Sequence, residues 1–255
     1  MKKIIDAHIH LDQYKQNSIN KMQQDHSLEA VITVSMNKKS CISNEELTKI
    51  HPFVYAAYGF HPEQRMPAEI EIIELFQWIK EHSSSMVAVG EVGLPHYVRE
   101  KSPLLYSLEP YIDLLEQFIL LAKEHNKPIV LHSIYDEAPI VLALLEKHNY
   151  MNAQFHWFKG DSVTIEHLIN NNCYVSITPD VLYEEEIKEL VKKYPLHQLM
   201  VETDGPWPFE GLFEQRKTMP SMIHHTIKEI AAIKKESEST VYTQLLKNTK
   251  RFFSI

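Results

Sequence analysis

Short apolar runs rich in β-branched residues alternate with helical patterns along the whole chain, and this alternation is what most constrains the fold. Eight such runs can be distinguished, at 4–11, 30–34, 53–58, 86–91, 129–132, 153–156, 173–177 and 199–204. Strands that alternate with helices generally form parallel sheets. Eight βα units in 255 residues fit a TIM (β/α)8 barrel. We therefore expect a single α/β domain that spans residues 1–255.

The segments between these runs place apolar residues at helical spacing. The helices predicted in this way include 43–50, 67–82, 137–148, 221–235 and 239–251. The segment 94–109 is the longest stretch without a regular pattern. Because loops of this length often cover a functional site, we expect it at the active face.

Composition and charge narrow the classes of function. Hydrophobic residues make up 44% of the sequence and charged residues 24%, which is ordinary for a soluble globular protein. No run is long enough to span a membrane and no signal sequence is evident, so we expect a cytoplasmic protein. Cys41 and Cys173 lie outside any CxxC pattern and are expected to be reduced. The net charge of −8 argues against broad attachment to duplex nucleic acid but permits a small pocket for one phosphate.

The first run contains two histidines, His8 and His10, separated by one residue. On a strand, alternate side chains share a face and lie about 7 Å apart along the backbone, so both imidazoles can converge on one cation. Four further potential ligands stand at the ends of later runs, namely Glu91, His132, His156 and Asp204. Chemistry in a TIM barrel occurs at the carboxyl ends of the strands, where all six side chains would meet.

Each of these residues also has a structural alternative. The two histidines of the first run are compatible with an ordinary edge strand. His132 or His156 could be a core histidine with satisfied hydrogen bonds, and Asp204 could cap a helix. The occurrence of all six at strand ends of one predicted barrel favours a metal or catalytic site.

Six ligands are too many for one hydrolytic ion with an open position, but they suit two divalent ions that share a carboxylate. Glu91 lies between the two histidine sets and is the expected bridge. The first ion is assigned His8, His10, Glu91 and Asp204, and the second Glu91, His132 and His156. Imidazoles and carboxylates without a thiolate suit Zn, Mn, Ni or Fe, and Mg less well. Water shared by two cations would ionise near neutral pH, with Asp204 able to shuttle the proton, so Asp204 and Glu91 are the candidate catalytic residues.

Several short motifs occur along the chain, and their combination and order are specific although each motif alone is not. They are IDAHIHL (5–11), GFHP (59–62), VGEVGL (89–94), LHS (131–133), FHWFKG (155–160), ETDGPW (202–207) and NTKRFF (248–253). With these motifs the sequence resembles TatD-type metal-dependent hydrolases, within the amidohydrolase superfamily of TIM barrels. The resemblance implies a two-metal phosphodiesterase, typically a deoxyribonuclease. The ligand positions of the family fall on the same six residues.

The sequence departs from the family pattern at three places. Pro95-His96 stands where an aspartate usually follows Gly-Leu. Ile134 stands where an arginine often follows the fifth-strand histidine, and Lys159 replaces a serine. These departures remove none of the predicted ligands, but they change the residues around the ligands and at the substrate rim.

Candidate substrate contacts lie on the segments that follow the strands. His61, in GFHP, either contacts substrate or a ligand or has a structural role in the turn before Pro62. The candidate phosphate contacts are Lys159, Arg99 and Arg216, for each of which a solvated surface charge is the alternative. Four aromatic residues closely follow ligands and could form a stacking rim or simply pack, namely Trp157, Phe158, Trp207 and Phe209.

The sequence leads to one main hypothesis and two alternatives. The main hypothesis is a metal-dependent deoxyribonuclease that acts on DNA ends, or on a small phosphodiester, through a metal-bound hydroxide. The first alternative is a hydrolase of a small amide, lactone or phosphate ester, since fold does not determine substrate. The second is a metal-binding protein that has lost catalysis. No protein partner is inferred.

Overall fold

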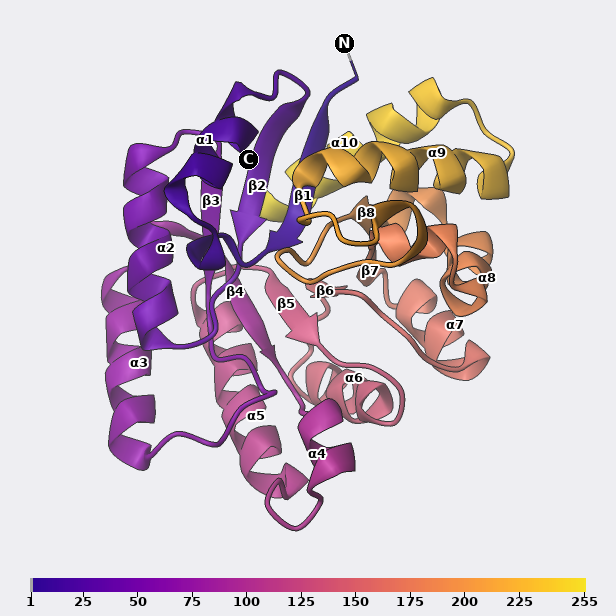
Figure 1. Cartoon of the computed structure of the whole chain (residues 1–255). Helices are drawn as coiled ribbons and strands as arrows, with labels where there is room; N and C mark the ends of the chain where they lie inside the picture. Colours follow the sequence, from indigo (N-terminus) through magenta and orange to yellow (C-terminus); the bar gives the residue numbers. More distant parts are fainter. Residues whose placement is uncertain (1) are drawn as a thin grey trace.

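A computed structural model describes residues 2–255 (Figure 1). The described residues form one sheet of eight parallel strands, paired in the order of the sequence from β1 to β8. The strands are β1 (Ile4–Ile9), β2 (Leu28–Thr33), β3 (Val54–Tyr58), β4 (Met86–Gly93), β5 (Ile129–His132), β6 (Ala153–Phe155), β7 (Tyr174–Ile177) and β8 (Leu199–Val201). The predicted TIM barrel is confirmed.

The barrel closes between β1 and the segment that follows β8. Ile9 forms a parallel bridge with Gly205. The amide of His10 donates to the Gly205 carbonyl at 2.8 Å, and the amide of Asp204 donates to the His8 carbonyl at 2.9 Å. These bonds bring the last predicted ligand beside the first two.

Helices surround the sheet on its outer side (Figure 1). They are α1 (Gln16–Gln24), α2 (Lys38–Ile50), α3 (Glu69–Glu81), α4 (Tyr97–Lys101), α5 (Leu108–Glu124), α6 (Glu137–Lys147), α7 (Ser162–Asn170), α8 (Glu185–Lys193), α9 (Ile223–Lys234) and α10 (Glu238–Phe253). Each long helix buries its apolar stripe; in α5, Leu114, Leu115 and Phe118 are buried against the sheet. A separate buried cluster joins residues of six strands with Phe252 and Phe253 of α10, as expected for the inside of a barrel.

Several segments differ from the sequence-based expectation. The eighth strand ends at Val201, so Asp204 lies beyond it, in a turn with φ of 46°. Strand β4 continues past Glu91 to Gly93. The segment 94–109 contains the short helix α4, and α2 begins earlier than predicted because the Asn37 side chain accepts the Ser40 amide and caps it.

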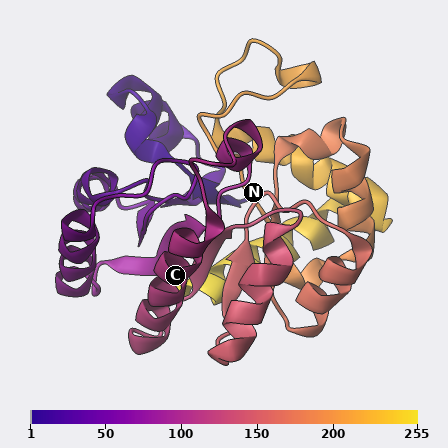
Figure 2. The same cartoon turned by 90° about the horizontal axis from the view of Figure 1, so that it is seen from below.

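The loop between β8 and α9 and the short helix α4 project from the same end of the barrel (Figure 2). This is the end at which the strands terminate. Within residues 2–255, no helix combines the length and the apolar character that a membrane span requires. Cys41 and Cys173 are free and buried.

Asn248, in the C-terminal NTKRFF motif, fixes α10 to β8. It is 3% exposed, and its amide nitrogen donates to the carbonyls of Leu196 (2.8 Å) and Leu199 (2.6 Å). Asn248→Ala leaves both carbonyls without this donor, so we expect the free energy of unfolding to fall by about 2–3 kcal/mol in urea titrations. Asn170→Ala, at an exposed helix end, is the matched control. A loss no larger than that of the control would contradict this role.

Candidate metal centre

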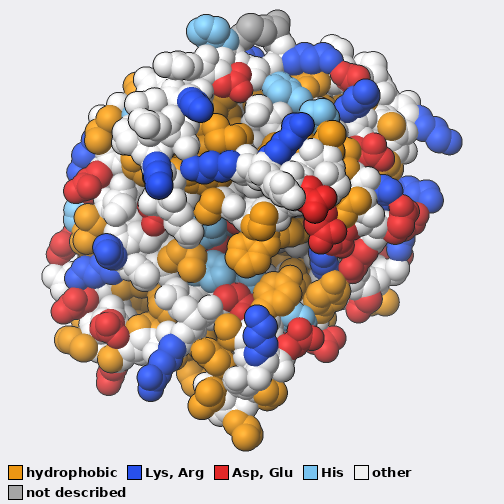
Figure 3. All heavy atoms as spheres, viewed as in Figure 1, with side chains coloured by type: hydrophobic (Ala, Val, Ile, Leu, Met, Phe, Trp, Pro, Cys, Tyr) orange, Lys and Arg blue, Asp and Glu red, His pale blue; other side chains and the backbone are white. Residues whose placement is uncertain are grey.

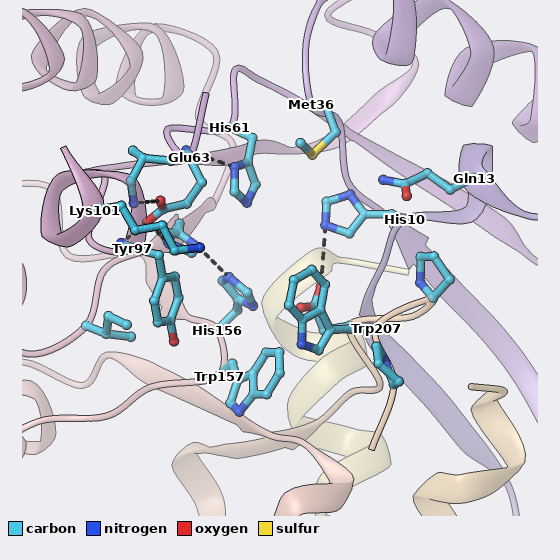
Figure 4. Close-up of a pocket in the computed structure, with 16 residues that line it drawn as sticks. His10, Gln13, Met36, His61, Glu63, Tyr97, Lys101, His156, Trp157 and Trp207 are labelled. Atoms are coloured by element: carbon cyan, nitrogen blue, oxygen red, sulfur yellow. Dashed lines mark hydrogen bonds and ion pairs between the residues drawn. The ribbon is translucent and has the colours of Figure 1, made fainter. Parts of the chain in front are cut away.

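A cavity of about 570 Å³ opens at the carboxyl ends of the strands. In the space-filling view, histidine atoms are visible in a hollow among hydrophobic side chains (Figure 3). The lining includes His10, His61, His132, His156 and Asp204. The close-up shows the labelled imidazoles of this group directed toward the cavity (Figure 4).

One group of donor atoms forms between β1, β4 and the turn after β8. His8 Nε2 lies 3.1 Å from Glu91 Oε2 and 3.4 Å from Asp204 Oδ1. His10 Nε2 lies 3.4 Å from each of the same two oxygens. β1 ends at Ile9, so His10 lies just beyond the strand, whereas the sequence placed it on the strand. Its imidazole nevertheless reaches the same two oxygens as that of His8.

A second group surrounds the other oxygen of the same carboxylate. Glu91 Oε1 lies 2.6 Å from His156 Nε2 and 3.0 Å from His132 Nδ1. These two nitrogens are 3.2 Å apart. His61 Nε2 also lies 3.2 Å from Glu91 Oε1. The structure therefore brings together all six residues singled out in the sequence, with His61 beside them.

Glu91 is fully buried at the centre of this arrangement. Burial opposes its ionisation, but the imidazoles of His156, His61 and His8 outweigh burial and hold the pKa of Glu91 well below its usual range. Burial likewise opposes a charge on His10, yet its contacts with Asp204 and Glu91 raise its pKa to about 10. The carboxylates thus supply the negative charge that attracts protons or cations to this site.

Backbone features hold the centre in place. A Cβ on residue 59 would lie 2.7 Å from the Glu91 carbonyl oxygen, so glycine at the end of β3 permits the close approach of β4. Asp6 on β1 accepts hydrogen bonds from the amide and hydroxyl of Thr203, at 2.9 and 2.5 Å. This link fixes the turn that carries Asp204.

Two carboxylates near the centre were missed in the sequence. Glu63 Oε1 lies 3.1 Å from His132 Nε2, on the side of the ring opposite Glu91. Glu202 is fully buried, accepts the Trp157 amide at 2.8 Å and lies 3.6 Å from His156 Nδ1. Glu202 could have been identified from the sequence, because it lies within an apolar run and a buried carboxylate needs hydrogen-bond or charged partners. Glu63 lies in a loop, outside any apolar run, and no sequence pattern points to it.

The candidate phosphate contacts lie at the periphery. Arg99, on α4, forms an ion pair with Glu137. Lys159 Nζ pairs with Glu184 at 2.9 Å, and Arg216 is exposed in the loop after β8. Among the described residues that line the cavity, the cationic side chain is Lys101 of α4.

The aromatic candidates divide into two pairs. Trp157 and Trp207 line the cavity, and Trp207 is 61% exposed. Phe158 and Phe209 are buried and serve packing. The Trp157 indole donates to Asp180 Oδ2 at 2.5 Å, which fixes the orientation of its ring at the cavity wall.

Asp180 makes the stability of the protein depend on pH. Burial raises its pKa from 3.8 to about 6, against the hydrogen bonds from Thr178 and Trp157. The folded state therefore holds the proton of Asp180 more tightly than the unfolded chain does. The protonated carboxyl stabilises the fold fully below the pKa of Asp180 in the unfolded chain, and this stabilisation is lost as the pH rises through about 6. Relative to Asp180→Asn, we expect the wild type to lose up to about 3 kcal/mol between pH 4 and 7.

Urea unfolding of both proteins at several pH values measures this difference. Asp136→Asn, at an exposed aspartate, is the control and should follow the wild type. Parallel profiles for the wild type and Asp180→Asn would show that burial does not shift this carboxyl.

Comparison with known proteins extends these observations. The sequence matches the family described as TatD related DNase over residues 5–254. It is 38% identical over 253 residues to an uncharacterized metal-dependent hydrolase of Haemophilus influenzae, covering 99% of this chain and 100% of that protein. It is 28% identical over 261 residues to YabD of Bacillus subtilis, also named an uncharacterized metal-dependent hydrolase, covering 99% of each.

A solved structure shows the same fold. The crystal structure of YjjV, a TatD homolog from Escherichia coli, superposes with a TM-score of 0.89 at 21% identity, over 100% of both chains. The motifs, the barrel and the buried histidine–carboxylate groups agree with these comparisons. The chain belongs to the TatD related DNase family of metal-dependent hydrolases.

Proposed function

We propose that this protein holds two divalent cations on either side of Glu91 and hydrolyses phosphodiester bonds, at the ends of DNA strands. The observation that carries the proposal is that each oxygen of one buried carboxylate faces its own set of donor atoms. A carboxylate shared between two cations has this arrangement in two-metal hydrolytic sites.

The distances within the first group fit a bound cation. Ligand atoms about 2.1 Å from a tetrahedral ion lie about 3.4 Å from one another. The four distances from His8 and His10 to Glu91 and Asp204 are 3.1, 3.4, 3.4 and 3.4 Å. Within residues 2–255, Glu91 Oε2 and Asp204 Oδ1 are buried and form no hydrogen bond. Buried acceptors of this kind need a partner, and a cation supplies one.

The second group offers a similar set, namely Glu91 Oε1, His132 Nδ1 and His156 Nε2. His61 has a different role there, because its Nδ1 accepts the Glu63 amide at 3.1 Å. Burial lowers the pKa of His61, which favours the neutral ring. The neutral ring then carries its proton on Nε2, which faces Glu91. We therefore assign His61 as a hydrogen-bond donor to Glu91 or to a substrate oxygen, and not as a ligand.

Two cations in such a site acidify water and stabilise negative charge on phosphoryl oxygens. The chain provides the groups around that chemistry. Asp204, at the cavity wall, accepts and releases the proton. Lys101 is placed to contact a phosphate, and Trp157 and Trp207 offer faces for stacking a base. A pocket in a barrel mouth admits a strand end more readily than a closed duplex, and the net charge of −8 gives no broad electrostatic track.

The cavity also gives a reason to keep a second candidate. Its wall includes Met36, Ile134 and Val98, which suit a small apolar ester, lactone or amide. A hydrolysis panel with metal-loaded protein distinguishes the two. We expect turnover of linear single-stranded DNA and of a small phosphodiester. Turnover of a lactone or amide alone would favour the second candidate. No turnover of any substrate would indicate a metal-binding protein without catalysis.

The bridging role of Glu91 leads to a specific prediction. Glu91→Ala should weaken binding of both ions, because it removes a ligand from each group. His156→Ala should weaken mainly one ion, because the other group retains its donors. Calorimetric titration with Zn or Mn measures the number of ions and their affinities, and His197→Ala, at an exposed position, is the control. Loss of a single ion in both variants would show that Glu91 does not bridge.

A further inference from the structure

The side chain of Glu63, in the loop after β3, contacts two functional parts of the cavity at once. We propose that Glu63 is a positioning residue, which fixes the orientation of His132 for cation binding and anchors α4 as a wall of the cavity. This inference rests on the proposed metal centre. Figure 4 shows Glu63 beside His61 at the end of the cavity where Tyr97 and Lys101 lie.

The contact with His132 sets the direction in which the ring presents its lone pair. His132 Nε2 lies 3.1 Å from Glu63 Oε1, and Nδ1 lies 3.0 Å from Glu91 Oε1. A carboxylate only accepts hydrogen bonds, so Nε2 donates its proton to Glu63. Nδ1 also faces a carboxylate and donates to Glu91 while it carries a proton. A cation beside Glu91 would replace that proton, and the proton that remains on Nε2 would keep the ring directed at Glu63. A carboxylate behind a ligating histidine holds its tautomer and orientation, and its loss typically lowers metal affinity 10–100-fold.

The same carboxylate accepts three successive backbone amides at the start of α4. Oε1 accepts from His96 (2.5 Å) and Tyr97 (3.0 Å), and Oε2 accepts from Val98 (2.8 Å). Tyr97, Val98 and Lys101 line the cavity. A helix of five residues has little stability of its own, so these bonds determine where that wall stands.

A second carboxylate holds α4 but lies away from the metal ligands, which provides a matched control. Glu137, at the start of α6, accepts from His96 Nδ1 at 2.7 Å and pairs with Arg99. Glu137 therefore shares the anchoring of α4 with Glu63, whereas the contact with His132 belongs to Glu63. Comparing the two sites separates a general loosening of α4 from an effect on the metal centre.

The test compares Glu63→Gln and Glu137→Gln with the wild type in two measurements. Calorimetric titration with Zn or Mn gives the affinity of each ion, and hydrogen–deuterium exchange follows the amides of residues 96–98. For Glu63→Gln we expect a 10–100-fold weaker affinity for one ion together with faster exchange. For Glu137→Gln we expect faster exchange in the α4 segment with ion affinities unchanged. Thermal unfolding of each variant confirms that it is folded, and Glu63→Asp replaces Glu63→Gln if it is not.

Each other outcome overturns a distinct claim. Unchanged ion affinities and exchange in Glu63→Gln would refute the positioning role and leave the proposed metal centre intact. Equal loss of ion affinity in Glu63→Gln and Glu137→Gln would show that α4, and not the contact with His132, supports the ligands. A wild-type protein that binds no divalent ion would refute the proposed metal centre itself, and this inference with it.

Discussion

A fully buried carboxylate, Glu91, is the constraint on which the rest of the site depends. A buried charge is costly unless it is paired, and here imidazoles from several strands surround it. Removing one partner of such a group leaves the charge uncompensated, so the histidines and Glu91 require one another. The parallel barrel makes this possible, because every strand delivers its end to the same mouth. In the sheet, β4 lies between β1 on one side and β5 and β6 on the other. Glu91 therefore presents Oε2 to His8 and Oε1 to His132 and His156.

The links around this centre are of two kinds. Hydrogen bonds across the closure, from Thr203 to Asp6 and between His10 and Gly205, hold Asp204 against β1. Two further carboxylates hold groups at the wall of the cavity. Glu63 joins His132 to α4, and Asp180 orients Trp157. The cavity wall and the central histidines are therefore linked through a few carboxylate side chains.

The strands and the strand-end residues were predictable because both follow from local patterns. Short apolar runs between helical patterns identify the strands. In a parallel barrel the carboxyl ends of the strands lie together, which brings His132 and His156 close to Glu91. The sequence placed Asp204 at the end of the eighth strand, whereas the structure places it in the turn that follows. It lies three residues beyond β8, where Thr203 and Asp6 fix the turn. Glu63 and Lys101 could not be found in this way, because their places depend on how loops and the short helix α4 fold over the mouth. The family resemblance gave the hydrolase class, and the comparisons with known proteins support it.

We propose that Glu91 lies between two cations. Anomalous diffraction from crystals of the protein loaded with Zn or Mn tests it most directly, because it locates each ion without reference to activity. We expect two anomalous peaks about 3.5–4 Å apart, one against Glu91 Oε2 near His8, His10 and Asp204, and one against Oε1 near His132 and His156. A single peak, or two peaks of which only one contacts Glu91, would contradict it.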